Sequence, residues 1–258
     1  MSPLADFSAF HFPGWKHELL FSAPRPIHIE YCSGNGAWIA EKAKKHPEIN
    51  WLAVEKRFDR TRKIWSKIKN NGLSNLVAAF AEGMSLSSNY LPSSSVAAIY
   101  VNFPDPWPKQ RHAKHRIISP FFFHEASRVL EPGGRLIFVT DDEPYSTLFL
   151  QLASSQTDPV LIPENSCHLD ASKPRDSIDR KRAEYSNIDP FSIVESRELS
   201  RGPSGTNLRE LALVQTLPPP GYAAPPDDYG TSFFDSLFRN QGKPIYYHEL
   251  VKDRRDIV

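Results

Sequence analysis

From residue 27 onward, short apolar segments alternate with longer segments in which apolar side chains recur at helical spacing. Ile27-His-Ile-Glu30 precedes a glycine turn at Cys32-Ser-Gly-Asn-Gly36, and a segment rich in Ala, Glu and Lys follows until Pro47. Strands separated by helices of about 10 to 15 residues indicate βαβ units, because parallel strands need a crossover connection. The pattern predicts an α/β fold: a Rossmann-like, doubly wound and mostly parallel sheet with helices on both faces.

The boundaries of the expected elements follow from apolar runs and from glycine and proline. Strands are predicted at 27–30, 50–54, 76–80, 96–103 and 136–139. Helices are predicted at 37–46, 58–70 and 120–130. The helix at 58–70 has Ile64, Trp65 and Ile68 at helical spacing and should end at Asn71-Gly72.

The pattern weakens in the last third of the chain. Residues 154–190 contain several prolines and no sustained period, which is typical of a long surface excursion. Strands are possible at 191–199 and 208–217, a stiff proline-rich linker at 217–226, and a last ordered piece at 229–251. We expect an N-terminal extension at 1–26 and a single domain at 27–258, with an atypical, proline-rich insertion at about 155–225 before the C-terminal strand.

Composition excludes several classes of protein. Apolar residues make up 40% and charged residues 24%, which is typical of a globular protein rather than a disordered chain. No apolar run approaches the roughly 20 residues that cross a bilayer, and the first residues lack the basic start of a secretory signal. Two cysteines cannot form a disulfide scaffold, so we expect a cytoplasmic protein without a membrane or metal site. Because 31 basic and 30 acidic residues leave a net charge of +1, a polyanionic partner needs a local basic patch.

A glycine turn lies where the first predicted strand meets the first predicted helix. Gly34 and Gly36 let the backbone approach a ligand there, and the start of the helix offers free N–H groups. Glu55 ends the second predicted strand, 19 residues beyond Gly36. An acidic side chain at a spacing of about 20 typically accepts hydrogen bonds from the ribose hydroxyls of a nucleotide. The two features predict a cofactor that contains adenosine.

The residues around this turn favour S-adenosylmethionine over NAD. A dinucleotide-binding fingerprint has a third glycine where this chain has Ile39. Glu30, just before the turn, would repel a pyrophosphate and attract the ammonium and sulfonium groups of S-adenosylmethionine. Glu82, after the third predicted strand, is a candidate for contact with the adenine edge, although a solvated loop carboxylate explains it equally well.

A loop stiffened by proline follows the fourth predicted strand. Asn102-Phe-Pro-Asp-Pro-Trp-Pro108 leads directly into Lys109-Gln-Arg-His-Ala-Lys-His-Arg116. Ligands in open parallel sheets bind beyond the carboxyl ends of the strands, and the prolines hold Asp105 and Trp107 with little conformational entropy to lose. The cationic residues that follow predict contact with phosphate rather than only a solvated face. They are Lys109, Arg111, Lys114 and Arg116.

The segment 102–116 closely resembles the hallmark of the bacterial tRNA (guanine-N7-)-methyltransferase family, a Pro-Asp-Pro-Trp loop followed by Lys, Arg and His residues. The resemblance covers residues 27 to about 146 and implies the fold of a class I S-adenosylmethionine-dependent methyltransferase. It also implies methylation of N7 of the guanosine at position 46, in the variable loop of tRNA. tRNA is then the expected partner, no obligate protein partner is expected, and the protein could be a monomer or a homodimer.

The resemblance also assigns roles to single residues. It implies four cofactor contacts: Glu30, Glu55, Glu82 and Asp105. Asp105 matches the family's proposed catalytic residue, and Lys109 and Asp141 match its substrate-binding positions. The family usually has Asp or Asn in place of Glu82. It generally has a further glycine where Cys32 stands, so we expect Cys32 to be a tolerated small residue and not a nucleophile.

A second match lies near the C-terminus. The family has a Thr/Ser-x-aromatic-Glu segment there, followed by a Phe, a Gly and an Ile-Tyr strand. Ser232-Phe-Phe-Asp235 fits this pattern with Asp in place of Glu, which implies that Ser232 and Asp235 bind substrate within the motif at 229–251. Ser192-Ile-Val-Glu195 is a rival match that lacks the downstream residues.

The expected chemistry needs no general base, because N7 of neutral guanine carries a lone pair and no proton. The enzyme must instead align N7, the methyl carbon and the sulfur, and exclude water. Asp105 could accept hydrogen bonds from guanine N1–H and the exocyclic amine, or offset the positive charge that develops on the purine. Trp107 could stack on the base or pack within the loop.

Two other interpretations stay open. An NAD-dependent oxidoreductase is disfavoured by Glu30 and Ile39, and a non-catalytic RNA-binding protein is disfavoured by the presence of Glu55 and Asp105 beside Glu30. A second cluster of Lys and Arg residues lies at 56–69. Its members spread around the predicted helix, so part of this cluster is expected to be a solvated face.

Overall fold

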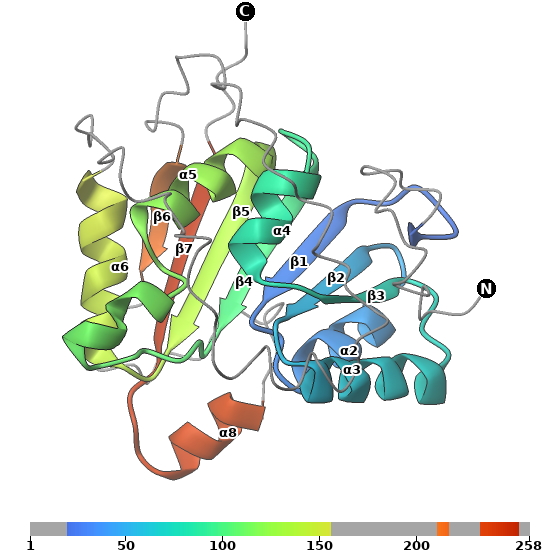
Figure 1. Cartoon of the computed structure of the whole chain (residues 1–258), viewed down its shortest axis with the longest axis horizontal. Coiled ribbons are helices and arrows are strands. Elements are labelled where there is room, and N and C mark those ends of the chain that lie inside the picture. The colour runs from blue at the N-terminus through green and yellow to red at the C-terminus, as the bar shows by residue number, and fades with distance from the viewer. Residues whose placement is uncertain (1–19, 156–210, 217–232, 253–258) are drawn as a thin grey trace, which may run out of the picture.

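The computed structural model of the protein describes residues 20–155, 211–216 and 233–252, and within them a single sheet packed between helices (Figure 1). The strands are β1 (Ile27–Tyr31), β2 (Asn50–Glu55), β3 (Leu76–Phe80), β4 (Val96–Asn102), β5 (Leu130–Thr140), β6 (Leu211–Thr216) and β7 (Tyr246–Lys252). The helices are α2 (Ala37–Lys45), α3 (Phe58–Asn71), α4 (Gly83–Tyr90), α5 (Pro120–Val129), α6 (Glu143–Ser155) and α8 (Phe233–Asn240), with a 3₁₀ helix, η1 (Gln110–His115).

The sheet is doubly wound, as predicted. Its strand order is β3-β2-β1-β4-β5-β7-β6, and the neighbouring strands from β3 to β5 are all parallel. Only β7 runs against its two neighbours, β5 and β6. The chain leaves the β1 side after β3 and returns to pair β4 with the other edge of β1. This reversal between β1 and β4 is the switch point at which open α/β sheets bind their ligands.

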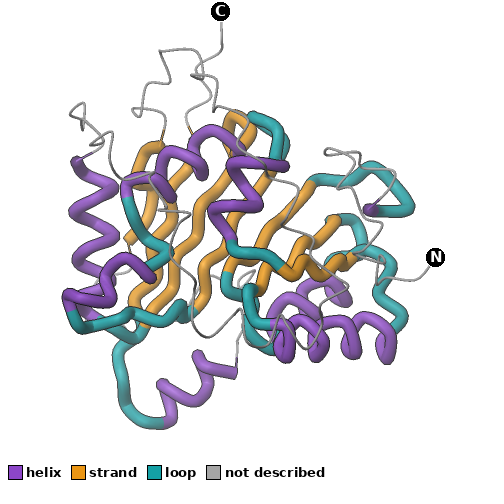
Figure 2. The backbone as a smooth tube through the Cα atoms, in the orientation of Figure 1, coloured by secondary structure: helices purple, strands orange, loops and turns teal. Residues whose placement is uncertain are grey.

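Side chains of successive strand residues enter two separate cores, because a strand turns alternate residues to opposite faces. Val101 and Phe138 pack in one core with buried residues of α4, α5 and α6. Tyr100 and Ile137 pack in the other with buried residues of α2 and α3. Figures 1 and 2 show α4 and α5 in front of the sheet. The sheet is therefore covered by helices on both faces.

The observed boundaries agree with the predicted ones to within a few residues where the pattern was regular. The helix at 58–71 ends as expected at Gly72, which has a left-handed conformation (φ 62°) and donates its N–H to the carbonyls of Ile68 and Lys69. The strand predicted at 136–139 begins earlier, at Leu130, and runs through Pro132-Gly-Gly134. The expected strand at 191–199 and the linker at 217–226 lie outside the described residues. Where the sequence predicted a strand at 208–217, β6 pairs with β7.

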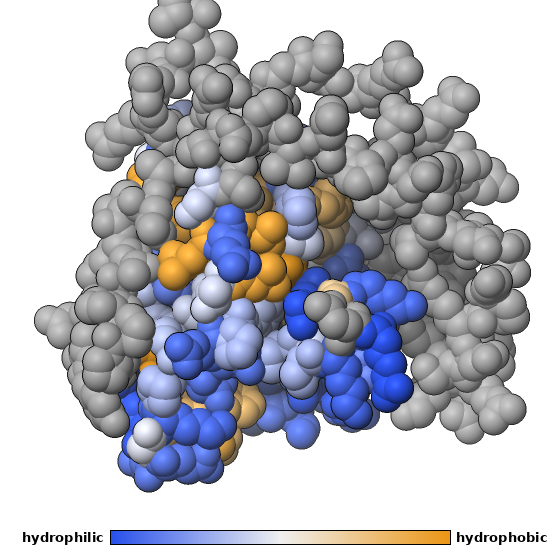
Figure 3. Space-filling model, turned by 90° about the vertical axis from the view of Figure 1, so that its left-hand side faces the viewer, coloured by the Kyte–Doolittle hydropathy of each residue, from blue (hydrophilic) through white to orange (hydrophobic). Residues whose placement is uncertain are grey.

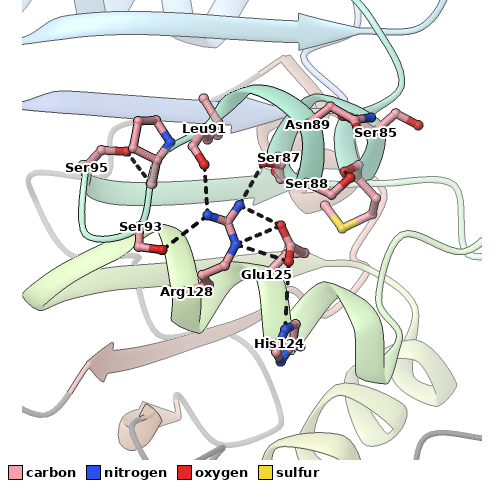
Figure 4. A network of polar contacts seen from close by, with 12 residues as sticks. Ser85, Ser87, Ser88, Asn89, Leu91, Ser93, Ser95, His124, Glu125 and Arg128 are labelled. Carbon is pink, nitrogen blue, oxygen red and sulfur yellow. Dashed lines mark hydrogen bonds and ion pairs between the residues drawn. The ribbon is translucent and has the colours of Figure 1, made fainter. Parts of the chain in front are cut away.

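Three α-helices, α4, α6 and α8, and the 3₁₀ helix η1 were not predicted as helices; for α8 the sequence indicated only an ordered piece at 229–251. The sequence of α4, Gly-Met-Ser-Leu-Ser-Ser-Asn-Tyr, is poor in strong helix formers, so tertiary contacts must hold it. Figure 4 shows the main contact, the guanidinium of Arg128 on α5. It donates to the carbonyls of Ser87 and Leu91, each at 2.8 Å, and pairs with the buried carboxylate of Glu125 at 2.8 Å. Arg128 thus gives the Ser87 carbonyl, which already accepts from the N–H of Leu91, a second donor, and it supplies a partner to the Leu91 carbonyl just after the helix.

Candidate active site

The centre of the site is a buried carboxylate at the switch point. Glu30, near the end of β1, is 3% exposed, and its Oε1 accepts a hydrogen bond from the Asn102 side chain at the end of β4 (2.8 Å). Among the described residues, its Oε2 has no hydrogen-bond partner. Desolvation raises the pKa of Glu30 to about 8, although the hydrogen bond from Asn102 opposes the shift. A buried carboxylate with one unsatisfied oxygen is an acceptor for a cationic ligand.

The glycine turn wraps closely around this carboxylate. Cys32, Gly34 and Gly36 all have left-handed backbone conformations, with φ of 58°, 56° and 68°. The hydroxyl of Ser33 donates to the Glu30 carbonyl (2.7 Å) and accepts from the N–H of Val54 (3.1 Å), which ties the turn to β2. The turn is fixed before any ligand arrives.

Gly36 is needed for packing as well as for conformation. A Cβ at this position would lie 2.6 Å from Cγ1 of Ile64 on α3, and real side chains do not tolerate that distance. At Gly34 the nearest atom to an added Cβ would be the Cys32 carbonyl oxygen at 3.9 Å, so only its positive φ requires glycine. The backbone at Gly34 therefore stays open to a ligand, whereas Gly36 lets α3 pack beneath the turn.

Glu55 connects the end of β2 to the glycine turn. Its side chain is 4% exposed; Oε2 accepts from the N–H of Gly34 and Oε1 from the N–H of Arg57, both at 2.9 Å. An ionised carboxylate has about four acceptor positions, so two remain for ribose hydroxyls. Glu82 lies at the end of β3, is exposed, and caps α4 by accepting from the N–H of Ser85 (2.7 Å).

The loop after β4 has a strained backbone. Phe103 and Trp107 both have φ of 46°, a region that side chains with a Cβ rarely adopt. Among the described residues, three of the four non-glycine residues with positive φ lie in this loop and in the glycine turn, and the fourth is Ser94. Strained residues cluster where surrounding contacts over-determine the backbone, often at functional sites. Asp105 lies exposed between the two strained positions.

Arg116 holds this loop. Its half-buried guanidinium donates from Nε to the Pro106 carbonyl (3.0 Å) and from Nη2 to the Trp107 carbonyl (2.9 Å). The Trp107 ring packs against His112 and His115, at centroid distances of 5.6 and 5.2 Å. Trp107 therefore packs within the loop in this structure. The sequence did not indicate the contact of Arg116 with the loop, and its expected contact with phosphate stays a prediction.

The two loops lie close enough to influence each other electrostatically. The backbone of Cys32 leaves the residue partly open to solvent, but its thiol is desolvated; this raises the pKa of the thiol to about 12, and the negative charges of Glu55 and Asp105 contribute. A thiol with this pKa is protonated at neutral pH. The expectation that Cys32 is not a nucleophile stays a prediction.

The basic segment borders the site on the outside. Lys109, Arg111 and Lys114 are exposed on and beside η1, and within the described ranges Lys109 and Lys114 form no ion pair. In Figure 3 the lower part of the described surface, toward the carboxyl ends of the strands, is mainly hydrophilic. Arg111 donates a hydrogen bond to the ring of His112 (3.3 Å), whereas Lys109 and Lys114 can meet an anionic partner without breaking an ion pair among the described residues.

The C-terminal motif contributes a helix to the same edge of the sheet. Figure 1 shows α8 below the carboxyl ends of the central strands, and its Phe234 and Phe238 rings lie 6.1 and 5.5 Å from the ring of Phe103. Asp235 on α8 is 1% exposed and pairs with Arg239 at 3.1 Å.

The remaining predicted substrate-binding residues are Asp141, Ser232 and the rival segment 192–195. Asp141, after β5, pairs with Lys243 (3.0 Å). Ser232 and the rival segment 192–195 lie outside the described residues. The sequence did not single out Asn102 or Lys243; only Asn102 had a signal, its place at the start of the proline-rich loop.

Metal-binding clusters and membrane-spanning helices are both absent from the part of the chain that the structure describes. No group of three or more His, Cys, Asp or Glu side chains could hold a metal ion there. No helix there is long and apolar enough to cross a membrane.

Comparisons with known proteins point to one family. A sequence family described as "Putative methyltransferase" matches residues 24–182. A protein of Chlamydia muridarum named tRNA (guanine-N(7)-)-methyltransferase is 34% identical over 246 residues, which cover 95% of this chain and 84% of the relative. A protein of Chlamydia caviae with the same name is 35% identical over 243 residues, covering 94% of this chain and 83% of the relative.

A solved structure supports the fold independently. The 16S rRNA methyltransferase KamB aligns with a TM-score of 0.51 at 15% identity, over 92% of each chain. At this level of identity the likeness concerns the fold alone, which is that of class I methyltransferases.

The strained backbone at Cys32 leads to a prediction about stability. A left-handed conformation costs a residue with a Cβ about 1–2 kcal/mol, whereas glycine adopts it freely but loses more entropy on folding. We expect Cys32→Gly to raise the free energy of unfolding by about 0.5–1 kcal/mol, measured by urea denaturation. Ser94→Gly, at the fourth strained position and away from the site, should give a similar gain. A loss of stability in Cys32→Gly alone would show that the thiol makes contacts worth more than the strain.

Proposed function

The chain belongs to the tRNA (guanine-N(7)-)-methyltransferase family, and we propose that it transfers a methyl group from S-adenosylmethionine to N7 of the guanosine at position 46, in the variable loop of tRNA. The observation that carries this proposal is the buried Glu30 carboxylate at the switch point, with one unsatisfied oxygen, beside the strained loop that holds Asp105. Family membership supports the reaction, and the burial and geometry of these residues support the place that we propose for it.

The residues at the switch point fit S-adenosylmethionine, whose sulfonium supplies an electrophilic methyl group. The unsatisfied Oε2 of Glu30 suits the ammonium of an amino acid, and it would repel the pyrophosphate of a dinucleotide. The open backbone at Gly34 and the start of α2 at Gly36 border the same place, and Glu55 retains acceptor positions for the ribose. Glu82 is the remaining candidate for the adenosine end. This donor set favours a cationic cofactor over NAD.

The chain's own groups then have to orient the base. Asp105 is exposed at the carboxyl edge, where its carboxylate accepts hydrogen bonds from the N1–H and amine of guanine or offsets positive charge on the purine. Arg116 holds the carbonyls of Pro106 and Trp107, so the backbone that follows Asp105 is ordered before tRNA binds. No residue needs to remove a proton from N7 before transfer.

We assign the expected tRNA contacts to the basic segment beside the loop and to the residues around α8 and the end of β5. Lys109, Arg111 and Lys114 provide phosphate contacts beside the loop. Asp141 already pairs with Lys243, and Asp235 with Arg239. To bind the guanosine, each carboxylate must either keep its ion pair and use a remaining acceptor position, or give up the ion pair. Ser232, directly before α8, completes the proposed substrate motif.

Transfer of labelled methyl groups tests the function directly. Purified protein, methyl-labelled S-adenosylmethionine and an unmodified tRNA transcript should give N7-methylguanosine as the labelled nucleoside after digestion and chromatography. The label should disappear when guanosine 46 is changed to adenosine. Label in a different nucleoside would keep the methyltransferase and overturn the substrate site, and binding of RNA without cofactor or label would favour the non-catalytic RNA-binding alternative.

Asp105 gives a prediction that separates catalysis from binding. We expect Asp105→Ala to abolish turnover and to leave the dissociation constant for tRNA nearly unchanged, because phosphate contacts supply most of the affinity. The matched control is Asp142→Ala, which changes a carboxylate that caps α6 through the N–H of Tyr145. Wild-type turnover in Asp105→Ala would remove this residue from the mechanism.

The raised pKa of Glu30 predicts proton release on cofactor binding. With a pKa of about 8, Glu30 is mostly protonated at pH 6.8, while an ammonium partner requires the carboxylate. Affinity should therefore rise with pH up to about 8 and fall above it, where an α-amino group with a pKa of about 7.7–8.0 loses its own proton. Calorimetry at pH 6.8 in two buffers of different ionisation enthalpy should detect the release of about one proton per S-adenosylmethionine bound.

Two variants serve as controls for this linkage. Glu30→Gln should bind S-adenosylmethionine weakly and release no proton, whereas Glu82→Gln, at the exposed cap of α4, should release the proton as the wild type does. Equal heats in both buffers for the wild-type protein would contradict the assignment of Glu30 to the ammonium.

A further inference from the structure

Helix α3 concentrates positive charge in a chain that has little overall. Its sequence, FDRTRKIWSKIKNN, contains five Lys or Arg residues and one Asp, whereas the whole chain carries a net charge of +1. Within the described residues, none of those five cations takes part in an ion pair; Asp59 pairs with Arg57, which precedes the helix. This cluster is not used by the cofactor site or by the loop that carries Asp105.

The cations of α3 lie on two separate flanks. The helix buries Thr61, Ile64 and Ile68 against the sheet. Residues three, four and seven positions apart share one side of a helix. Arg60 and Lys67 therefore project from one side of the buried stripe, with Lys63 between them. Arg62 and Lys69 project from the other side.

Two contacts show where each flank points. Ile64, four residues after Arg60, lies directly beneath Gly36 in the glycine turn. Phe58, four residues before Arg62, packs against Phe80 at the end of β3, with ring centroids 5.6 Å apart. The flank of Arg60 and Lys67 is thus turned toward the glycine turn and α2, and the flank of Arg62 and Lys69 toward the outer edge of the sheet.

Lys56 connects the first flank to the basic segment of the loop. Lys56 precedes α3. Desolvation is the main cause that lowers the pKa of His115 on η1, and the charges of Lys114 and then Lys56 lower it further. Lys56 also acts electrostatically on Cys32. Lys56 therefore lies within electrostatic range of η1, and it stands four residues before Arg60 in the sequence.

We propose that the flank of α3 formed by Arg60, Lys63 and Lys67 binds the sugar-phosphate backbone of the tRNA substrate, as a continuation of the basic segment Lys109–Lys114. The proposal rests on the proposed function, because it takes the target guanosine to lie at Asp105. A folded tRNA whose variable loop enters there extends well beyond the loop, and this flank is the cationic surface that adjoins the glycine turn. Backbone contacts of this kind fix the position of an RNA without reading its sequence.

The two flanks allow a matched test on one helix. Arg60→Gln/Lys67→Gln and Arg62→Gln/Lys69→Gln each remove one Arg and one Lys, seven residues apart, from α3. The dissociation constant of the full-length protein for an unmodified tRNA transcript is measured by fluorescence anisotropy over a series of salt concentrations. Each lost phosphate contact lowers the slope of log K against log[salt] by about 0.7–0.9. We expect the first variant to lose about 1.4–1.8 from the slope and to bind at least several-fold more weakly.

The outcome in the second variant decides between a contact surface and a general field. Arg62→Gln/Lys69→Gln should keep the wild-type slope and affinity, and both variants should keep the wild-type melting temperature. Equal losses in the two variants would overturn the proposal in favour of a diffuse positive potential, and an unchanged slope in Arg60→Gln/Lys67→Gln would overturn it outright. Methyl transfer by the wild-type protein is scored separately: its absence rejects the proposed function, whereas its presence with unchanged slopes rejects only the surface on α3.

Discussion

The structure depends on the hydrogen bond between Glu30 and Asn102 across the switch point of the sheet. β1 and β4 are neighbours in space, but the chain reaches β4 only after β2 and β3, so the loops that follow β1 and β4 diverge and leave the strand ends uncovered. One loop is the glycine turn and the other carries Asp105. Backbone pairing of β1 with β4 sets the spacing between them, and the hydrogen bond from Asn102 orients the Glu30 carboxylate so that one of its oxygens remains for a ligand.

Strain in the two loops is held by contacts from outside them. Left-handed conformations at Cys32, Phe103 and Trp107 cost about 1–3 kcal/mol each, so the surrounding structure must over-determine them. Glu55 holds the glycine turn through the N–H of Gly34, and Arg116 holds the second loop through the Trp107 carbonyl. Rings of α8 then pack on Phe103. The site is therefore pre-organised, which spares the enzyme the entropy of ordering these loops when tRNA binds.

How much the sequence could predict depends on whether a feature is local. Strands, their parallel arrangement and the glycine turn follow from periodicity and turn residues over short stretches, and they were predicted. α4 was not, since its helix depends on Arg128, which lies about 40 residues further along the chain. The pairing of Asp141 with Lys243 could not be predicted for the same reason: it joins the end of β5 to the segment before β7, and these neighbouring strands are about 100 residues apart in the sequence. In the same way, Arg116 looked like one more cation of a basic run, because only the folded loop brings the carbonyl of Trp107 to its guanidinium.

At this edge of the molecule the acidic groups of the switch point are buried and the basic groups lie on the surface. Carboxylates of Glu30 and Glu55 are buried at the switch point, where the low dielectric makes each one selective for a cationic or hydroxyl-rich ligand. Lysines and arginines lie outside, on η1 and α3, where water screens their charges. Each of them alone binds an anion weakly, so strong binding requires a polyanion such as RNA, whose phosphates contact several of them at once. A cationic cofactor and an anionic RNA can therefore meet at one edge of a nearly neutral protein. This arrangement also keeps the long-range field weak, so that the position of the tRNA is set by contacts at this edge and not by overall attraction.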